Sequence, residues 1–354
     1  VLEQAGYKTI HVGKAHFGCI GSEGADPKNL GFDINIAGSA IGSPGSYYGE
    51  NGYGAIKGAK SRAVPGLEQY FHTNTFLSDA LTLEADKKIE KAVAEKRPFY
   101  LNMAHYAVHS PFETDKRFIG HYTDPKKNQQ ACAFATLIEG MDKSLGDLMD
   151  KLEELGIAEN TLIIFLGDNG GDAPLGGAAD YGSSAPFKGK KGSEYEGGVR
   201  VPFIVAWAHP DAENKFQKAF PVAQNAIQTQ MGTVMDIYPT VLSVAGVKVP
   251  ENHILDGSTL ERMIAGKKDK AHRDDFRKGD WKLIYYYNPE HPDAPYYKLF
   301  NLSEDPYEKN DVAKAERKKA KELFGLMVKR LEMEKALYPI DKDKNELRPF
   351  FIAK

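Results

Sequence analysis

The stretches FLGDNGG, residues 165–171, and KGKKGSEYEGGVRVP, residues 188–202, decide how this chain folds. Residues 161–166 are apolar and β-branched types that are typical of a buried strand. A glycine ends this run, and a carboxylate and a carboxamide follow, Asp168 and Asn169. Their oxygens are the ligands that a hard divalent cation prefers. The sequence therefore predicts a cation-binding strand end, with the lysines of the second stretch nearby to attract an anionic substrate.

Two other expected strands are also followed by cationic or titratable side chains. The segment AGYKTIHVGKAHFG, residues 5–18, contains a short apolar strand and then Lys14 and His16. The segment FYLNMA, residues 99–104, runs out into His109. Ligands gather beyond the carboxyl ends of parallel strands, so we expect these groups to share one site with Asp168 and Asn169.

The order of elements predicts an α/β fold with a large, mostly parallel sheet flanked by helices. Apolar residues recur at helical spacing over residues 77–96 and over about 130–155, and each of these helices precedes an expected strand. Residues 201–207 form a further apolar strand, and residues 232–245 have a helical pattern.

The composition of the chain changes towards the C-terminus. WKLIYYY and YKLFNL predict an antiparallel hairpin whose turn is residues 288–295, and residues 313–337 predict a charged amphipathic helix. We therefore divide the chain into an α/β domain, residues 1–265, and a small C-terminal α+β subdomain, residues 266–354.

Three motifs in this order resemble the sulfatase family, arylsulfatase-like enzymes of the alkaline-phosphatase-like superfamily. The first is Gly-Tyr-x-Thr-x-x-x-Gly-Lys-x-His, and the second is the strand-end Asp-Asn. The third is Lys-Gly-Ser-x-x-Glu-Gly-Gly-x-Arg-x-Pro. The matching residues are Gly6, Tyr7, Thr9, Gly13, Lys14, His16, Asp168, Asn169, Lys191, Gly192, Ser193, Glu196, Gly197, Gly198, Arg200 and Pro202.

The resemblance implies a role for each candidate site residue. Lys14 and Lys191 would bind the sulfate group as compact cations, and Asp168 and Asn169 would hold calcium, with magnesium as the alternative. The other two expected catalytic groups are His16, which would help to release the sulfated intermediate, and His109, which would contact the sulfate and protonate the leaving group. His105 is a rival for the second histidine, whereas Glu196 and Arg200 are expected to brace their turn.

Two further family motifs have no counterpart in these residues. An Asp-Asp pair that supplies metal ligands, and a Cys/Ser-x-Pro-Ser-Arg motif that becomes the nucleophilic formylglycine, both precede the first motif, which here begins at Gly6. Neither Cys19 nor Cys132 lies in such a sequence. We therefore expect an N-terminally truncated sulfatase, inactive as given, with a weak or empty metal site and with the formylglycine in the missing segment.

A glycine- and tyrosine-rich stretch, residues 38–58, predicts a long loop. It is either a surface insertion or the wall of a substrate pocket. In the second case, Tyr47, Tyr48 and Tyr53 would offer an aromatic face to a sugar or an aryl group.

Overall composition excludes several classes of protein. A net charge of −3 over 354 residues gives no basic field for nucleic acid, and two cysteines are too few for a disulfide framework. No apolar run reaches the length of a membrane span.

The resemblance implies a periplasmic, secreted or lysosomal location. An unpaired edge of the sheet predicts either association with another copy or local disorder near residues 1–60.

Three functions are consistent with these residues. The first is hydrolysis of sulfate esters on a carbohydrate or aryl substrate through formylglycine, that is, a sulfuric ester hydrolase whose ligand is a sulfated small molecule or glycan. The second is a phosphodiesterase or phosphonate hydrolase of the same superfamily. The third is an inactive homologue that binds sulfated glycans.

Overall fold

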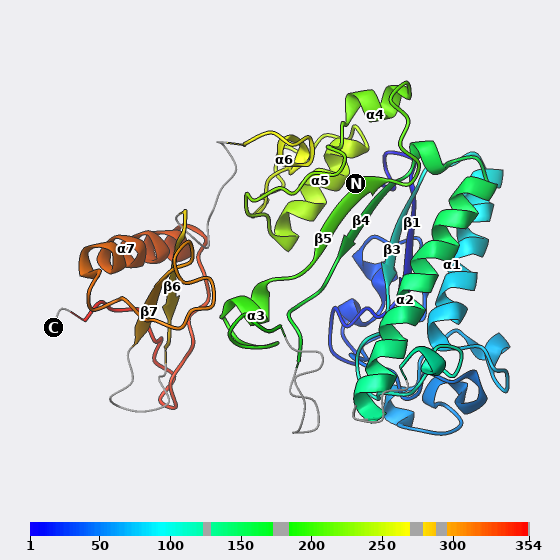
Figure 1. Cartoon of the computed structure of the whole chain (residues 1–354), viewed down its shortest axis with the longest axis horizontal. Coiled ribbons are helices and arrows are strands. Elements are labelled where there is room, and N and C mark those ends of the chain that lie inside the picture. The colour runs from blue at the N-terminus through cyan, green and yellow to red at the C-terminus, as the bar shows by residue number, and fades with distance from the viewer. Residues whose placement is uncertain (123–128, 173–183, 270–278, 288–295, 353–354) are drawn as a thin grey trace. The chain divides into compact units, whose positions relative to one another are not determined.

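The computed structural model describes residues 1–122, 129–172, 184–269, 279–287 and 296–352. They form two compact units (Figure 1). The first unit comprises residues 1–164, 205–228 and 237–267, and the second comprises residues 165–204, 229–236 and 268–354. Each unit is described by itself below.

A parallel three-stranded sheet in the order β2-β1-β3 forms the centre of the first unit. Its strands are β1 (Lys8–Gly13), β2 (Ile34–Ile36) and β3 (Phe99–Ala104). Strand β1 pairs with β3 along its whole length, from Lys8 opposite Phe99 to Gly13 opposite Ala104. This register brings the carboxyl ends of the two strands to the same edge of the sheet, where Lys14 and the His109 segment begin.

Two long helices, α1 (Leu77–Ala94) and α2 (Gln129–Glu154), lie side by side next to this sheet (Figure 1). The apolar face of α1, with Leu77, Leu81 and Ile89, is buried in the same core as residues of β1. Burial of this stripe stabilises a helix that its intrinsic propensity alone would leave marginal.

The remaining strands form two pairs, and the helices that follow are mostly short. Strands β4 (Leu162–Leu166) and β5 (Phe203–Trp207) pair with each other, and both cross the boundary between the units. The short helices are α3 (Glu196–Val199), α4 (Lys215–Ala219), α5 (Ile237–Val244) and α6 (Glu261–Ile264).

An antiparallel hairpin and one helix dominate the C-terminal part of the second unit. Strand β6 (Trp281–Tyr285) pairs with β7 (Tyr297–Asn301), and α7 (Arg317–Met333) packs near them. Leu299, Ala320 and Leu323 form a small core between the hairpin and the helix.

Most elements expected from the sequence are confirmed with boundaries shifted by a few residues. The helices at 77–96 and 130–155, the strands and the hairpin are all present, and the predicted helix at 232–245 is a single 3₁₀ turn followed by α5. The expected hairpin turn, residues 288–295, lies outside the described residues. Strand β2 was not predicted, because three residues are too few to show a periodicity. The division at residue 265 stays a prediction.

The glycine-rich stretch 38–58 is not an exposed aromatic loop. Tyr47 and Tyr53 are fully buried in the main core, and residues 49–54 form 3₁₀ turns. The expectation that these two rings face a sugar is therefore wrong, and Tyr48 is only half-buried. The structure describes all of residues 1–60, and local disorder of this segment or association with another copy stays a prediction.

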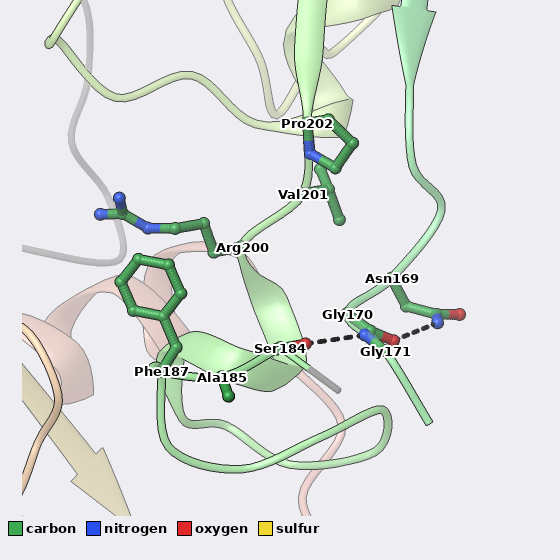
Figure 2. Close-up of a pocket in the computed structure, with 9 residues that line it drawn as sticks. All are labelled: Asn169, Gly170, Gly171, Ser184, Ala185, Phe187, Arg200, Val201 and Pro202. Carbon is green, nitrogen blue, oxygen red and sulfur yellow. Dashed lines mark hydrogen bonds between the residues drawn. The ribbon is translucent and has the colours of Figure 1, made fainter. Parts of the chain in front are cut away.

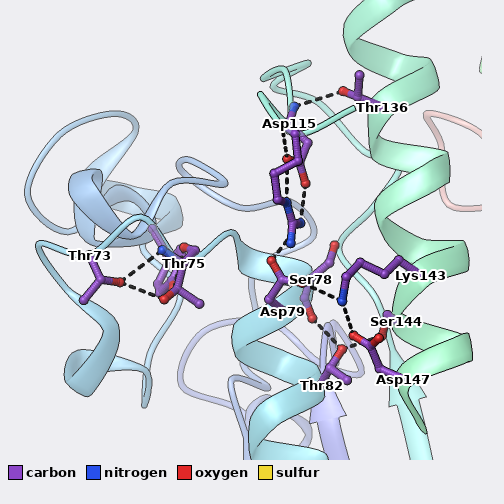
Figure 3. Close-up of polar contacts among 12 residues, drawn as sticks. Thr73, Thr75, Ser78, Asp79, Thr82, Asp115, Thr136, Lys143, Ser144 and Asp147 are labelled. Atoms are coloured by element: carbon purple, nitrogen blue, oxygen red, sulfur yellow. Dashed lines mark hydrogen bonds and ion pairs between the residues drawn. The ribbon is translucent and has the colours of Figure 1, made fainter. Parts of the chain in front are cut away.

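A buried polar seam of Ser78, Thr82 and Ser144 joins α1 to α2 (Figure 3). It continues to His105. Ser144 on α2 shares a short hydrogen bond with Thr82, which in turn donates to the carbonyl oxygen of Ser78 at 2.8 Å. The Oγ of Ser144 also lies 3.2 Å from His105 Nε2. His105 Nδ1 is buried without a partner among the described residues, and burial lowers the pKa of His105 to about 4.

Replacing His105 with Gln is expected to make the protein less sensitive to acid. Histidine titrates near pH 6.5 in the unfolded chain but at about 4 in the folded protein, so the unfolded state binds more protons between these values. This group therefore contributes stability above pH 6.5 that is lost as pH falls towards 4, by at most about 1.4 kcal/mol per pH unit. Denaturant unfolding from pH 7 to pH 4.5 measures the difference in slope.

The matched control is His253→Gln, at an exposed ring in the same unit. It should leave the slope close to that of the wild type. Equal slopes for the wild type and His105→Gln would contradict the neutral, buried state of His105.

Candidate functional site

The turn after β1 presents Lys14 because Gly13 lies against the end of β3. Gly13 has a φ of +104°, and a Cβ at this position would lie 1.9 Å from the carbonyl oxygen of Ala104. That same oxygen accepts a hydrogen bond from the backbone N–H of Lys14 at 2.7 Å. Only glycine fits both the backbone conformation and the close approach.

A buried histidine that the sequence reasoning missed supports this turn from within β1. The side chain of Asn102 on β3 donates to His11 Nδ1 at 3.0 Å, so the proton of the neutral ring is on Nε2. Nε2 then donates to the carbonyl oxygen of Gly13 at 3.1 Å. Burial lowers the pKa of His11, which keeps the ring in this neutral form.

His16 is exposed and follows Lys14 on the same turn. Its backbone has a φ of +54°, its N–H donates to the carbonyl oxygen of Ser39 at 2.9 Å, and its ring lies directly over Gly42. A Cβ on Gly42 would lie 2.8 Å from the His16 ring. The glycine-rich stretch therefore supports the ring of His16 by leaving room for it.

His109 is half-buried, and its backbone is fixed by a buried tyrosine. The Tyr47 hydroxyl lies 2.8 Å from the carbonyl oxygen of His109 and 2.9 Å from that of Tyr106. On the ring, Nδ1 lies near the carbonyl and hydroxyl oxygens of Ser110, at 3.1 and 3.3 Å. In contrast to His109, the rival His105 is held in the polar seam between the helices.

In the second unit, the Asp-Asn turn and the Lys191 turn lie against each other. The N–H of Lys191 donates to the carbonyl oxygen of Gly171 at 2.9 Å, and the N–H of Gly170 donates to that of Gly198 at 3.0 Å. A Cβ on Gly170 would lie 1.9 Å from the carbonyl oxygen of Gly197. The two glycine-rich motifs therefore pack backbone to backbone, and that they are parts of one site stays a prediction.

A pocket of about 390 Å³ opens beside Asn169 (Figure 2). Asn169 donates from Nδ2 to the carbonyl oxygen of Gly170 at 2.8 Å, which leaves Oδ1 as an acceptor. The pocket wall combines small backbone segments with an aromatic ring and a guanidinium. It is lined by Asn169, Gly170, Gly171, Ser184, Ala185, Phe187, Arg200, Val201 and Pro202.

Asp168 and Asn169 have the right donor chemistry for a hard cation but supply only part of its shell. A carboxylate and an amide oxygen suit calcium, which takes about six to eight oxygen ligands. Over the ranges that the structure describes, no three His, Cys, Asp or Glu side chains gather closely enough to hold a metal ion. The residues therefore fit a cation whose remaining ligands come from water, substrate or further oxygens.

A buried charge network holds the Lys191 turn against the hairpin. Lys282 Nζ on β6 lies 3.0 Å from Glu196 Oε1 and 2.9 Å from Glu308 Oε1, and all three side chains are at most 9% exposed. Glu308 also accepts from the backbone N–H of Glu196 at 2.6 Å and so caps α3. Arg200 binds the other oxygen of Glu196 at 3.1 Å. Glu196 and Arg200 thus brace the turn, as expected.

The candidate residues form two local sets. Lys14, His16 and His109 belong to the first unit, and Asp168, Asn169 and Lys191 belong to the second. Convergence of the two sets at one substrate stays a prediction.

Several supporting residues could not be identified from the sequence. They are His11, Tyr47, Asn102, Lys282 and Glu308, which act through contacts with distant segments. The only sequence signal was the Lys-Leu of the expected hairpin strand, which did not reveal that its lysine is buried.

Comparison with known proteins identifies the family. The family model described as sulfatase matches residues 1–247. The chain belongs to the sulfatase family. It is 28% identical over 293 residues to steryl-sulfatase of Homo sapiens, a match that covers 71% of this chain and 46% of that protein. It is also 28% identical over 285 residues to N-acetylgalactosamine-6-sulfatase of Mus musculus, covering 75% of this chain and 48% of that protein. This sulfatase chain therefore spans about half the length of these relatives.

Solved structures confirm the alkaline-phosphatase-like α/β fold of this sulfatase. The crystal structure of Ps i-CgsB in complex with k-i-k-neocarrahexaose is 28% identical in sequence, with a TM-score of 0.71. That match covers 95% of this chain and 73% of the other. No helix in the described part of this chain combines the length and the apolar character that a membrane span requires.

Replacing Gly13 with Ala should destabilise the first unit and displace Lys14. Because the new methyl group would meet a backbone oxygen that cannot move aside, we expect a loss of more than about 2 kcal/mol. Gly6→Ala is the matched control, because Gly6 also has a positive φ, +91°, but has open space around it. Urea denaturation measures the free energy of unfolding of both variants, and the difference between them reports the steric clash, since both positions have the backbone strain. Equal losses of free energy would contradict the role given to the Ala104 contact.

Replacing Lys282 with Met should destabilise the second unit by about 3–5 kcal/mol, because two buried carboxylates lose their shared cation. Lys319→Met, at a pair on the surface of α7, should cost less than about 1 kcal/mol. Thermal and urea unfolding measure both. A loss for Lys282→Met as small as that of the control would show that the network does not support the turn.

Proposed function

We propose that the protein hydrolyses sulfate esters of carbohydrates, and that Lys14 and Lys191 bind the sulfate group of the substrate. The observation that supports this proposal is the backbone packing of the Asp168 turn, whose side chains are the proposed metal ligands, against the Lys191 turn. Two similar proteins support the class of substrate, since one is named N-acetylgalactosamine-6-sulfatase and the other was solved in complex with a neocarrahexaose.

The residues of this chain would bind the substrate and move protons. The ammonium groups of Lys14 and Lys191 would neutralise the charged sulfate oxygens and orient the ester. His109 would donate a proton to the alcohol oxygen as the sulfur–oxygen bond breaks, because an imidazole can supply a proton near neutral pH. His16, exposed on the Lys14 turn, would accept a proton during release of sulfate.

Asp168 and Asn169 would hold the metal ion, calcium or its alternative magnesium. When bound, calcium draws charge from the sulfate oxygens, and a formylglycine supplies the attacking oxygen. The bound metal ion, the formylglycine and a location outside the cytoplasm are all proposals for the whole protein. Reading the coding sequence upstream of Val1 for Cys/Ser-x-Pro-Ser-Arg tests the source of the nucleophile.

A double-mutant cycle on Lys14 and Lys191 tests the shared sulfate site. Calorimetric titration with D-glucosamine 6-O-sulfate should show each single Ala variant binding about tenfold or more weakly, since each loses a charge-assisted contact. The two losses should not add, because both lysines contact one anion. Lys57→Ala, at an exposed lysine of the first unit, is the control and should bind like the wild type.

Additive losses would show that the two lysines do not share a ligand. The reaction itself is tested by comparing how fast the protein that carries residues 1–354 hydrolyses p-nitrophenyl sulfate and p-nitrophenyl phosphate. We expect faster hydrolysis of the sulfate. A preference for the phosphate would favour the phosphodiesterase class. Binding without hydrolysis of either ester would favour a protein that only binds sulfated glycans.

A further inference from the structure

Cationic and phenolic side chains from two distant segments surround Tyr195 in the second unit. Lys298 Nζ on β7 donates to Tyr195 Oη at 2.8 Å, and the Tyr286 hydroxyl, just after β6, donates to the same oxygen at 3.1 Å. Lys188 Nζ lies 4.4 Å from the centre of the Tyr195 ring. We name these four residues, Lys188, Tyr195, Tyr286 and Lys298, the Tyr195 cluster.

The two lysines of this cluster have no carboxylate partner within the described ranges. Lys298 contacts only hydroxyl groups and aromatic rings, and Lys188 donates to the backbone carbonyl oxygen of Glu308 at 3.1 Å. By contrast, Lys282 is shared between two carboxylates, and Lys190 pairs with Asp172 at 3.3 Å. Neither ammonium of the Tyr195 cluster therefore forms an ion pair with a described carboxylate, while the charges of Glu194 and Glu308 act on Tyr286.

The direction of the pKa shift of Tyr195 indicates that the two lysines act on its hydroxyl oxygen. Burial on its own raises the pKa of this phenol, but the hydrogen bonds from Lys298 and Tyr286 and the charge of Lys188 outweigh it, so the pKa is lowered overall. A half-buried phenol with a lowered pKa lies in a positive potential. The pKa of Tyr286 shifts the other way, because burial, its bond to Tyr195 and the charges of Glu194 and Glu308 raise it, so the positive potential is local to the Tyr195 hydroxyl. Such a potential attracts anions to a partly desolvated surface.

Holding the turn in place does not account for this arrangement. The network in which Lys282 and Arg200 pair with Glu196 and Glu308 already connects the turn to the hairpin, with two cations for two carboxylates. Lys298 is half-buried and Lys188 is exposed. A half-buried ammonium without a paired carboxylate costs free energy, which an anionic ligand at Lys298 would recover. Two members of the cluster, Lys188 and Tyr195, lie three and four residues from Lys191 in sequence.

We propose that the Tyr195 cluster is a binding subsite for a second sulfate group, carried by the same sugar substrate whose reactive sulfate is bound by Lys191. This rests on the proposed function and narrows it to multiply sulfated carbohydrates. Lys188 and Lys298 bind the second sulfate as cations. The Tyr195 hydroxyl, which accepts from Lys298 and Tyr286 and still carries its own proton, donates that proton to the second sulfate.

Calorimetry with two sugars tests the subsite. The wild type should bind D-glucosamine-2-N,6-O-disulfate about tenfold more tightly than D-glucosamine 6-O-sulfate, as expected for one added charge-assisted contact. The double variant Lys188→Ala/Lys298→Ala should lose this preference and keep its affinity for the monosulfate. Lys190→Ala, at the neighbouring paired lysine, is the control and should keep the preference.

An unchanged preference in the double variant, or no preference in the wild type, would overturn the proposal. Lys191→Ala should weaken binding of both sugars. If it weakens neither, the proposed function fails, and that failure is distinct from failure of the subsite.

A spectroscopic test on the unmutated protein is independent of folding defects in the variants. Tyrosine labelled with ¹³C at Cζ, with the Tyr195 signal assigned from Tyr195→Phe, is titrated with base in sodium sulfate and in sodium chloride at equal ionic strength. Sulfate in the cluster should raise the pKa of Tyr195, because it cancels the positive potential. The same Tyr195 pKa in both salts would overturn the subsite. A rise of this pKa in sulfate, together with equal affinity for the two sugars in calorimetry, would identify a site for free sulfate and overturn the link to the substrate.

Discussion

Two backbone contacts that tolerate no side chain determine where the candidate site residues lie. Gly13 and Gly170 each pack so closely against a neighbouring carbonyl oxygen that a Cβ would lie 1.9 Å from it. The first contact places Lys14 at the end of β3, and the second places the Asp168 turn against the Lys191 turn. Ordering a glycine on folding costs conformational entropy. Gly13 and Gly170 are nevertheless required, because a side chain at either position would clash with the neighbouring carbonyl oxygen.

Each turn is then fixed by buried polar groups that come from elsewhere in the chain. In the first unit, neutral His11 donates to the Gly13 carbonyl and Tyr47 binds the backbone at His109. In the second unit, Lys282 and Glu308 hold α3 and the turn that begins it. Buried partners of this kind are costly to disrupt, because removing one leaves the other unsatisfied in a low-dielectric interior. The turns that carry the candidate site residues are therefore stabilised by buried groups and not by their own exposed side chains.

Much of the fold could be predicted from the sequence, because helices α1 and α2 and the main strands have clear hydrophobic periodicity. The turns could be predicted because glycine, aspartate and asparagine mark them chemically. Periodicity could not show that Tyr47 and Tyr53 are core residues, since they lie in a stretch without regular spacing. Nor could it show that Lys282 is buried, because a lysine in a strand is ordinarily exposed and its two glutamate partners lie 86 and 26 residues away in sequence.

Convergence of the two local sets on one anion is the central claim about function. The most direct test is a crystal structure of the protein soaked with selenate, a sulfate analogue that anomalous scattering locates without ambiguity. The account predicts one selenate ion with the ammonium groups of Lys14 and Lys191 both within about 3 Å, the range of a charge-assisted hydrogen bond. Selenate bound by one lysine alone, with the other on a separate surface, would contradict it.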